Sequence, residues 1–562
     1  HVGRFIHSQM GCGQISKVVS PVHSSMLTHN HVGIRYPKWT DGCPYMDECQ
    51  YAPPSYETGP LHLPEGNFVD GLLGVADEEK LKEVLSQLAP GEDFLDFQFP
   101  PSDASISVLN SRDMSGVVWK KPKELVEEPK LYVEGVSRFD IIQGNLGDCW
   151  FLSACAAVTR VPSIIQNVLY PNQALYGESE QGLILMKFWR FGKWVTVFVD
   201  EYLPTSGEQL LFARAADPME FWVSYIEKGY AKLHGCYEAI NGGLAVEALV
   251  DLTGGIAERY EIETIDTDLL YLYLWKSIRH GGFITCSIKE LYEGDNGVTS
   301  EGLVRGHAYS LTSVECIYSS SVEDYINLVR VRNPWGSHNE WKGGWHDDDP
   351  RWDQIDGLVK DQIGYMCCSD GEFWMEYDEF CREFEDVSIC TLTPDFNTDG
   401  APDEYGHFVA LTGTWSLGVS AGGCRNDMER YQTNPQFLLT LTEPDDLYPS
   451  SFEDQPKCSV IIGLMQEHRR SVSTEQPSLH QIAFVIYKAD DVTGKLTAED
   501  IRQSSEVGNT GVYLNYRETV GRCHLPPGNY VIIPATFEPD CEGTFMLRVF
   551  SPKTFQFEEI LS

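Results

Sequence analysis

The residue with the clearest chemical setting in this 562-residue chain is Cys149, which follows the polar, glycine-rich segment Gln143-Gly-Asn-Leu-Gly-Asp. It begins an almost wholly apolar run, and this run predicts a buried helix over 149–158. A helix N-terminus stabilises a thiolate through its dipole and free amides. The same amides, with the Gln143 side chain as a further donor, can hold the oxyanion of a tetrahedral intermediate. The sequence therefore predicts a nucleophilic thiol at Cys149, whereas Cys155 fits a core cysteine.

Two later segments contain side chains that could activate this thiol. His307 begins an apolar strand in Arg-Gly-His-Ala-Tyr-Ser, and Asn333 ends the strand Val-Arg-Val-Arg-Asn before a proline. The order Cys, His, Asn along the chain is that of papain-like proteases, in which the asparagine orients the imidazole. A transglutaminase-like acyl transferase would have an aspartate as the third member, so Asn333 favours hydrolysis. A single histidine among 15 is more often structural, so the prediction depends on all three motifs.

The elements around these residues are expected to form several domains, because the chain is too long for one hydrophobic core. Residues 1–76 are rich in His, Gly, Pro, Ser and Tyr and are expected to be a flexible tail. A short helix is predicted at 77–90. A strand pair at 191–204 and a second helix at 219–235 follow the predicted nucleophile helix.

A hinge is predicted at Asn241-Gly-Gly243, because adjacent glycines bend easily. Beyond the hinge the pattern becomes rich in strands, with a break at 395–406. The last region, of about 155 residues, alternates strands and turns almost throughout, which predicts an antiparallel β-sandwich.

Charge and composition restrict the classes of function. The net charge is −41, from 83 acidic and 42 basic residues, and no basic run suggests a nucleic-acid face, so we expect no nucleic-acid partner. No apolar run is long enough for a transmembrane helix, and the first residues lack a signal-peptide core. The 16 cysteines are sparse and mostly in apolar contexts, which favours a reducing, cytoplasmic location.

Four segments together resemble the signature segments of the calpain family: QGNLGDCWFLSA, GHAYSLTSV, VRNPWGSHNEWKGGW and DGEFWMEYDEF. The resemblance implies an α+β multidomain fold, with a papain-like two-lobed cysteine protease core followed by the antiparallel β-sandwich. Its core halves would span 77–241 and 242–397, and the sandwich 398–562. It makes Cys149 the nucleophile, His307 the general base and acid, and Asn333 the orienting residue. Gln143 would be the oxyanion donor, and Trp335 would pack over the Asn–His pair.

The same resemblance implies that calcium is the cofactor, bound at two sites in the core. Hard oxygen ligands suit calcium, which tolerates irregular loops. Arg138 would couple the two sites through Glu372. The first site would use the carbonyls of Val133 and Gly135 with the carboxylates of Asp140 and Glu220. The second would use Glu340, Asp347, Asp370, Glu372 and a carbonyl near Cys368.

Some features depart from the family pattern. Nothing after the sandwich resembles a penta-EF-hand domain, so no penta-EF-hand small subunit is expected as a partner. Asp395–Gly400 and the turn after Ala489 imitate EF-hand loops, but each lacks a required ligand, and both are interpreted as turns. The acidic loop 442–455 could bind calcium or basic residues of the core, or remain a plain exposed loop. Met10-Gly11-Cys12 raises the hypothesis of dual acylation at Gly11 and Cys12.

The function expected from these residues is limited proteolysis of protein substrates by a calcium-activated cysteine endopeptidase in the cytoplasm. Peripheral contact with membranes or phospholipid is an additional hypothesis for the sandwich. The alternative from another class is a calcium-responsive, calpain-like scaffold with little turnover. The intact set of Cys149, His307, Asn333 and Gln143 favours the enzyme.

Overall fold

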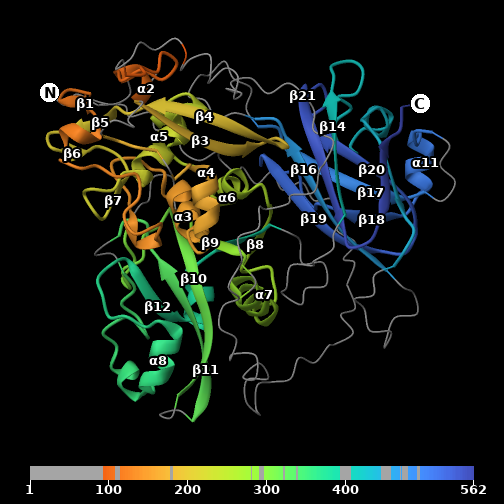
Figure 1. Cartoon of the computed structure of the whole chain (residues 1–562). Coiled ribbons are helices and arrows are strands. Elements are labelled where there is room, and N and C mark those ends of the chain that lie inside the picture. The colour runs from red at the N-terminus through yellow and green to blue at the C-terminus, as the bar shows by residue number, and fades with distance from the viewer. Residues whose placement is uncertain are drawn as a thin grey trace, which may run out of the picture.

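The structure is a computed structural model of the whole chain (Figure 1). It describes residues 86, 93–107, 114–171, 173–176, 182–279, 281–289, 297–319, 323–336, 340–392, 407–444, 457–468, 470, 479–489 and 494–561. The predictions for the tail 1–76, for Gly11 and Cys12, for the turn Asp395–Gly400 and for the break at 395–406 lie outside these residues. The same holds for nearly all of the helix 77–90 and most of the acidic loop 442–455.

The first part of the chain forms a body of helices and short sheets around α3 (Cys149–Val158), which we call the α3 body. Every residue of α3 after Cys149 is buried, as its apolar composition predicts. The second predicted helix corresponds to α5. The segment 191–204 contains β4 and the start of β5, but these two strands pair with β3 and with β1 and β6 and not with each other. The elements of the α3 body are α2 (Asp103–Ile106), β1 (Val117–Lys120), β2 (Ile141–Ile142), α3, α4 (Pro162–Val168), β3 (Leu183–Arg190), β4 (Lys193–Asp200), β5 (Leu203–Ser206), β6 (Gln209–Leu210), β7 (Arg214–Ala215), α5 (Trp222–His234) and α6 (Ala245–Thr253).

The second part is built on an antiparallel six-stranded sheet in the order β12-β11-β10-β9-β13-β8. Figure 1 shows its long strands β10 and β11 running away from the α3 body. Its elements are β8 (Ile256–Glu261), α7 (Thr267–Arg279), β9 (Phe283–Ile288), β10 (His307–Ser319), β11 (Asp324–Arg332), α8 (Gly357–Ile363), β12 (Glu372–Glu376), α9 (Tyr377–Glu383) and β13 (Asp386–Thr391).

Beyond the predicted hinge the chain is rich in strands, as expected, but helices α6 and α7, which were not predicted, lie among them. In α7 the buried residues Leu270, Leu274 and Ile278 recur every four positions and face the sheet core. Helix α6 follows the glycine pair in sequence but packs on α3 within the first core. Tertiary packing therefore places α6 with the α3 body.

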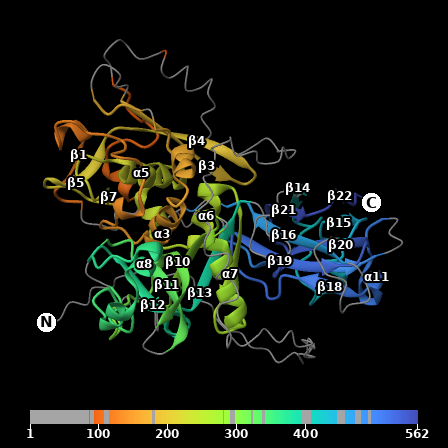
Figure 2. The ribbon, with the colours of Figure 1, turned by 60° about the horizontal axis from the view of Figure 1, so that its bottom comes forward.

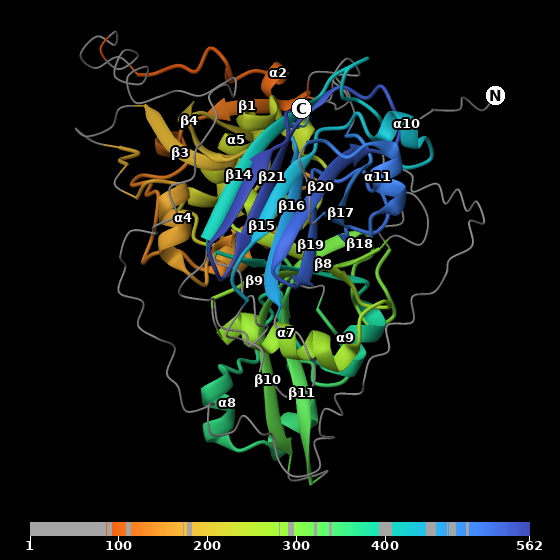
Figure 3. The ribbon, with the colours of Figure 1, turned by 90° about the vertical axis from the view of Figure 1, so that its right-hand side faces the viewer.

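The last part is a β-sandwich of two antiparallel sheets, in the orders β14-β21-β16-β19 and β18-β17-β20-β15-β22. Figure 3 shows these strands in front of the rest of the chain. The two sheets share one apolar core, which includes Trp415, Phe437 and Phe545. Its elements are β14 (His407–Trp415), α10 (Met428–Tyr431), β15 (Phe437–Leu441), β16 (Cys458–Gln466), β17 (Ile482–Lys488), α11 (Ala498–Gln503), β18 (Glu506–Asn509), β19 (Glu518–Leu525), β20 (Gly528–Thr536), β21 (Gly543–Ser551) and β22 (Phe555–Glu559).

The three parts meet around α6. This helix lies between α3 and the sandwich in both views (Figures 1 and 2). Arg517, just before β19, reaches α6 with one guanidinium nitrogen 2.9 Å from Asp251 Oδ2. Within the described residues, no helix is long and apolar enough to cross a membrane.

Candidate active site

The predicted imidazole and amide partners meet at the start of β10 and the end of β11. Because these neighbouring strands are antiparallel, His307 and Asn333 are brought to the same end of the sheet. His307 Nε2 lies 2.8 Å from Asn333 Oδ1, and the Trp335 backbone N–H donates to the same oxygen at 3.0 Å. The main-chain N–H identifies this atom of Asn333 as the acceptor oxygen of the amide. His307 Nε2 must therefore donate the proton in the His307–Asn333 hydrogen bond. The remaining nitrogen, Nδ1, is then the one free of a proton.

Aromatic rings enclose the imidazole. The rings of Trp335 and Tyr309 each have their centroid 4.9 Å from that of His307. His307 is 5% exposed and Asn333 is fully buried. Burial lowers the pKa of His307 to about 4, only partly opposed by the hydrogen bond with Asn333. The imidazole is therefore neutral and able to accept a proton at physiological pH.

Cys149 is the first residue of α3 and is the one residue of that helix that is not buried. Helix α3 packs against β9 and β10, the strand that begins with His307. This packing sets the helix that carries the thiol against the strand that carries the imidazole, with the amides of the first helical turn beside the thiol.

Gln143 connects the approach to α3 with the Asn333 turn. Its backbone N–H donates to Pro334 O at 3.0 Å, and its side-chain Nε2 donates to Leu146 O at 2.6 Å. One hydrogen of the side-chain amide is thus used within the loop, and the second is available for the predicted oxyanion role.

The residues predicted for the first calcium site lie together near the start of α5. Glu220 Oε1 accepts from the Val133 backbone N–H at 2.7 Å, and Asp140 Oδ2 accepts from Trp222 Nε1 at 3.2 Å. Gly135 has φ +103° in the same loop, a left-handed conformation. Burial, with added repulsion from Asp140, raises the pKa of Glu220 to about 8. Glu220 precedes α5 by two residues, whereas the sequence suggested that it opens this helix.

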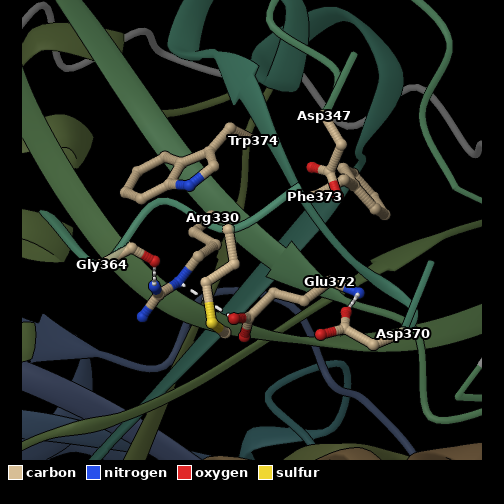
Figure 4. Close-up of a pocket in the computed structure, with 8 residues that line it drawn as sticks. Arg330, Asp347, Gly364, Asp370, Glu372, Phe373 and Trp374 are labelled. Atoms are coloured by element: carbon tan, nitrogen blue, oxygen red, sulfur yellow. Dashed lines mark hydrogen bonds and ion pairs between the residues drawn. The ribbon is translucent and has the colours of Figure 1, made fainter. Parts of the chain in front are cut away.

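Three of the residues predicted for the second site, Asp347, Asp370 and Glu372, line a small pocket beside β12 (Figure 4). Asp347 Oδ2 accepts from the Cys368 backbone N–H at 3.2 Å, while Asp347 Oδ1 is buried with no hydrogen-bond partner among the described residues. Burial, with repulsion from Glu340 and Asp370, raises the pKa of Asp347 to about 7. Glu340 accepts from the Gly371 backbone N–H at 2.7 Å.

Both groups of acids offer carboxylate oxygens, which are the type of ligand atom that calcium prefers. Crowded carboxylates with raised pKa values, and the orphaned oxygen of Asp347, are what a calcium ion would neutralise. However, no three His, Cys, Asp or Glu side chains in the described part of the chain are grouped closely enough to hold a metal ion. Calcium would therefore need main-chain carbonyls as additional ligands, as was predicted for Val133, Gly135 and Cys368.

Glu372 is committed to other partners in this structure. Arg138 donates to both of its oxygens, and the Thr312 hydroxyl donates to Oε1 at 2.8 Å. The predicted pairing of Arg138 with Glu372 is present, and it leaves the Glu372 carboxylate less available as a calcium ligand.

Sequence reasoning missed two arginines beside this pair, the half-buried Arg330 and the buried Arg332. Arg330 Nε lies 3.4 Å from Glu372 Oε2, and Arg332 donates to the Asp370 carbonyl at 2.9 Å. Arg332 is 1% exposed and immediately precedes Asn333. The signal was the alternation of arginine with valine in the buried strand β11, because buried arginines require acidic or carbonyl partners.

Comparison with known proteins shows which family the chain belongs to. The family model described as Calpain family cysteine protease matches residues 94–391, and that described as Calpain large subunit, domain III matches 411–550. The chain is 38% identical to Calpain-A of Drosophila melanogaster over 483 residues, which are 84% of the chain and 57% of that relative. It is also 38% identical to Calpain-9 of Rattus norvegicus over 476 residues, or 84% of the chain and 67% of the relative. The chain thus spans little more than half of Calpain-A, and it belongs to the calpain family of cysteine proteases.

Proposed function

We propose that the chain is a calcium-activated cysteine endopeptidase that cuts exposed segments of protein substrates. The observation that carries this proposal is the 2.8 Å contact between His307 Nε2 and Asn333 Oδ1, at the start of the strand against which α3 packs. This contact fixes the imidazole so that Nδ1 can take the thiol proton. The two-lobed, papain-like description of the core belongs to the same proposal.

The chemistry requires two covalent steps. The Cys149 sulfur attacks the scissile carbonyl carbon as His307 Nδ1 takes the thiol proton, and the α3 amides with Gln143 stabilise the oxyanion. His307 then gives the proton to the leaving amine, which leaves a thioester on Cys149. Water attacks the thioester with His307 as base, and the released carboxylic acid and free thiol restore the site.

Calcium would be held by the two acidic groups around Asp140 with Glu220 and around Asp347 with Asp370. When bound, it supplies positive charge that neutralises carboxylates which are otherwise crowded and partly protonated. Arg138 belongs to the first loop and pairs with Glu372 of the second group, so it supports a mechanical link between the two sites.

Limited proteolysis is tested with a protein of two stable domains joined by an exposed linker. In calcium, the wild-type chain is expected to yield two persistent fragments on a denaturing gel, and a Cys149→Ala variant none. Digestion to small peptides would contradict limited cleavage. An intact substrate with a folded wild-type chain would favour the scaffold alternative.

A further inference from the structure

The sandwich reaches the residue next to the nucleophile. Arg470 lies just beyond β16, and its guanidinium carbon is 4.5 Å from the centroid of the Trp150 ring. Trp150 follows Cys149 directly in α3 and is 1% exposed. A guanidinium over an indole face at this distance is an attractive cation–π contact, which is stronger when shielded from water.

Arg470 also holds the predicted hinge. It donates to Gly242 O at 2.7 Å and to Oε2 of Glu247, a residue of α6, at 3.0 Å. A Cβ on Gly243 would lie 2.4 Å from the Trp150 ring and 2.8 Å from the Arg470 guanidinium. The glycine backbone therefore contacts both side chains. We call Arg470, Gly243 and Trp150 the Arg470 stack.

The hinge is bonded in turn to the loop that enters α3. The Gly242 N–H donates to Gly147 O at 2.7 Å, and the Gly147 N–H donates to Asn241 Oδ1 at 2.9 Å. Trp150 Nε1 donates to Ile240 O at 3.0 Å. Gly147 and Trp150 lie on either side of Cys149, and both are tied to the hinge that Arg470 holds.

The sandwich has other anchors that do not touch this loop. Arg517 pairs with Asp251 at 2.9 Å, and Arg522 pairs with Glu258 of β8 at 2.9 Å. These contacts dock the sandwich on α6 and β8 through side chains other than Arg470. The Arg470 stack is therefore an additional contact of the sandwich, and it lies against the residue that follows the nucleophile.

We propose that Arg470 is a positioning residue for Cys149, through which the sandwich sets the orientation of the α3 N-terminus. This rests on the proposed protease function only in its effect on turnover, because the placement of the thiol can be measured without a substrate. Loss of the guanidinium would remove one packing partner of the Trp150 ring and one hydrogen-bond donor to the Gly242 carbonyl. Small displacements of a reacting group reduce rates strongly.

The test uses the full chain with Arg470→Met, Arg470→Gln and Arg470→Lys. Arg522→Met is the matched control, because it also removes a sandwich arginine that pairs with the core. The first readout is the rate of Cys149 alkylation by iodoacetamide across pH, followed by mass spectrometry of the peptide that contains Cys149. The second is kcat and KM for a quenched fluorescent peptide in calcium.

We expect Arg470→Met and Arg470→Gln to slow alkylation at neutral pH by about 10-fold and to raise the apparent pKa of the thiol. The kcat should fall by a similar factor with KM within about twofold. Arg470→Lys, which keeps the cation but not the forked hydrogen bonds, should recover most of the rate. Arg522→Met should remain within about twofold of wild type.

Wild-type alkylation in folded Arg470→Met or Arg470→Gln would overturn the proposal. An equal loss of rate in Arg522→Met would also overturn it, because the effect would then be general weakening of docking. If Arg470→Met does not fold, Arg470→Gln decides. If the wild type cleaves no peptide but its alkylation is faster than that of Arg470→Gln, the proposed function fails while the positioning role stands.

Discussion

Arg138 and Glu372 form an ion pair with two hydrogen bonds, from Nε to Oε1 at 2.7 Å and from Nη2 to Oε2 at 2.9 Å. Arg138 lies two residues before Asp140, within the loop of the first acidic group, and Glu372 begins β12 two residues after Asp370. The pair therefore joins the two candidate calcium sites by a rigid, planar contact. We propose that this pair couples the two sites when calcium binds.

Breaking this pair should weaken the response to calcium. We expect Arg138→Ala to lower peptide cleavage at a fixed calcium concentration about 10-fold, and Arg138→Lys to be intermediate, because lysine cannot form both hydrogen bonds. Calcium titrations of cleavage measure this directly. Lys289→Ala, which removes the exposed pair with Glu385, is the control and should be near wild type. Equal calcium curves for Arg138→Ala and wild type would refute the coupling.

Replacing Asn333 should reduce turnover without weakening substrate binding. Asn333→Ala removes the acceptor that holds His307 Nε2–H, so we expect kcat to fall by about 10²- to 10³-fold with KM little changed. Asn327→Ala, in the same strand β11, is the matched control. Steady-state kinetics of both variants provide the measurement, and a fall in Asn327→Ala of comparable size would show that the strand, and not the amide, matters.

Calcium binding should strengthen as pH rises from about 6 to 8.5. Glu220 and Asp347 have pKa values raised to about 8 and about 7, and calcium requires their ionised forms. Without calcium, the stability of the folded chain should change in the opposite direction over this pH range. A carboxyl whose pKa is raised on folding binds more protons in the folded state, so stability falls as pH rises through that range.

Thermal unfolding at pH 6 and pH 8, with and without calcium, measures both effects. The calcium-induced rise in the unfolding midpoint should be larger at pH 8, and Glu220→Gln or Asp347→Asn should reduce this pH dependence. Glu263→Gln, at an exposed position, should not change it. A calcium effect independent of pH in the wild type would contradict the assignment of these two carboxyls.

A methyl group at Gly243 should destabilise the contact between the hinge and α3. Its Cβ would lie 2.4 Å from the buried Trp150 ring, which cannot withdraw easily. We expect Gly243→Ala to cost about 1–3 kcal/mol, measured as a lower midpoint of thermal unfolding. Gly357→Ala, at an exposed position with no atom within 4 Å of the added methyl, should be neutral or slightly stabilising. Equal midpoints for the two variants would refute the close packing.

Local sequence patterns predicted those helices and strands whose formation depends mainly on residues close in the chain. The apolar run after Cys149 predicted α3, and the succession of strand-like segments and turns predicted the β-sandwich. Helix α7 was missed although its buried residues have helical spacing, because its tyrosines, leucines and tryptophan also suit strands. Arg470 could not be found from its neighbours, since its partner Gly242 lies 228 residues away in the chain. Its role depends entirely on tertiary contacts.

The most direct test of the account is hydrolysis of a quenched fluorescent peptide while calcium is titrated from micromolar to millimolar concentration, with a Cys149→Ala variant measured alongside. The account predicts cleavage that requires calcium in the wild type and is absent from the variant at every concentration. Cleavage by the wild type without calcium would contradict the assignment of the two acidic groups, and cleavage by Cys149→Ala would contradict the nucleophile itself.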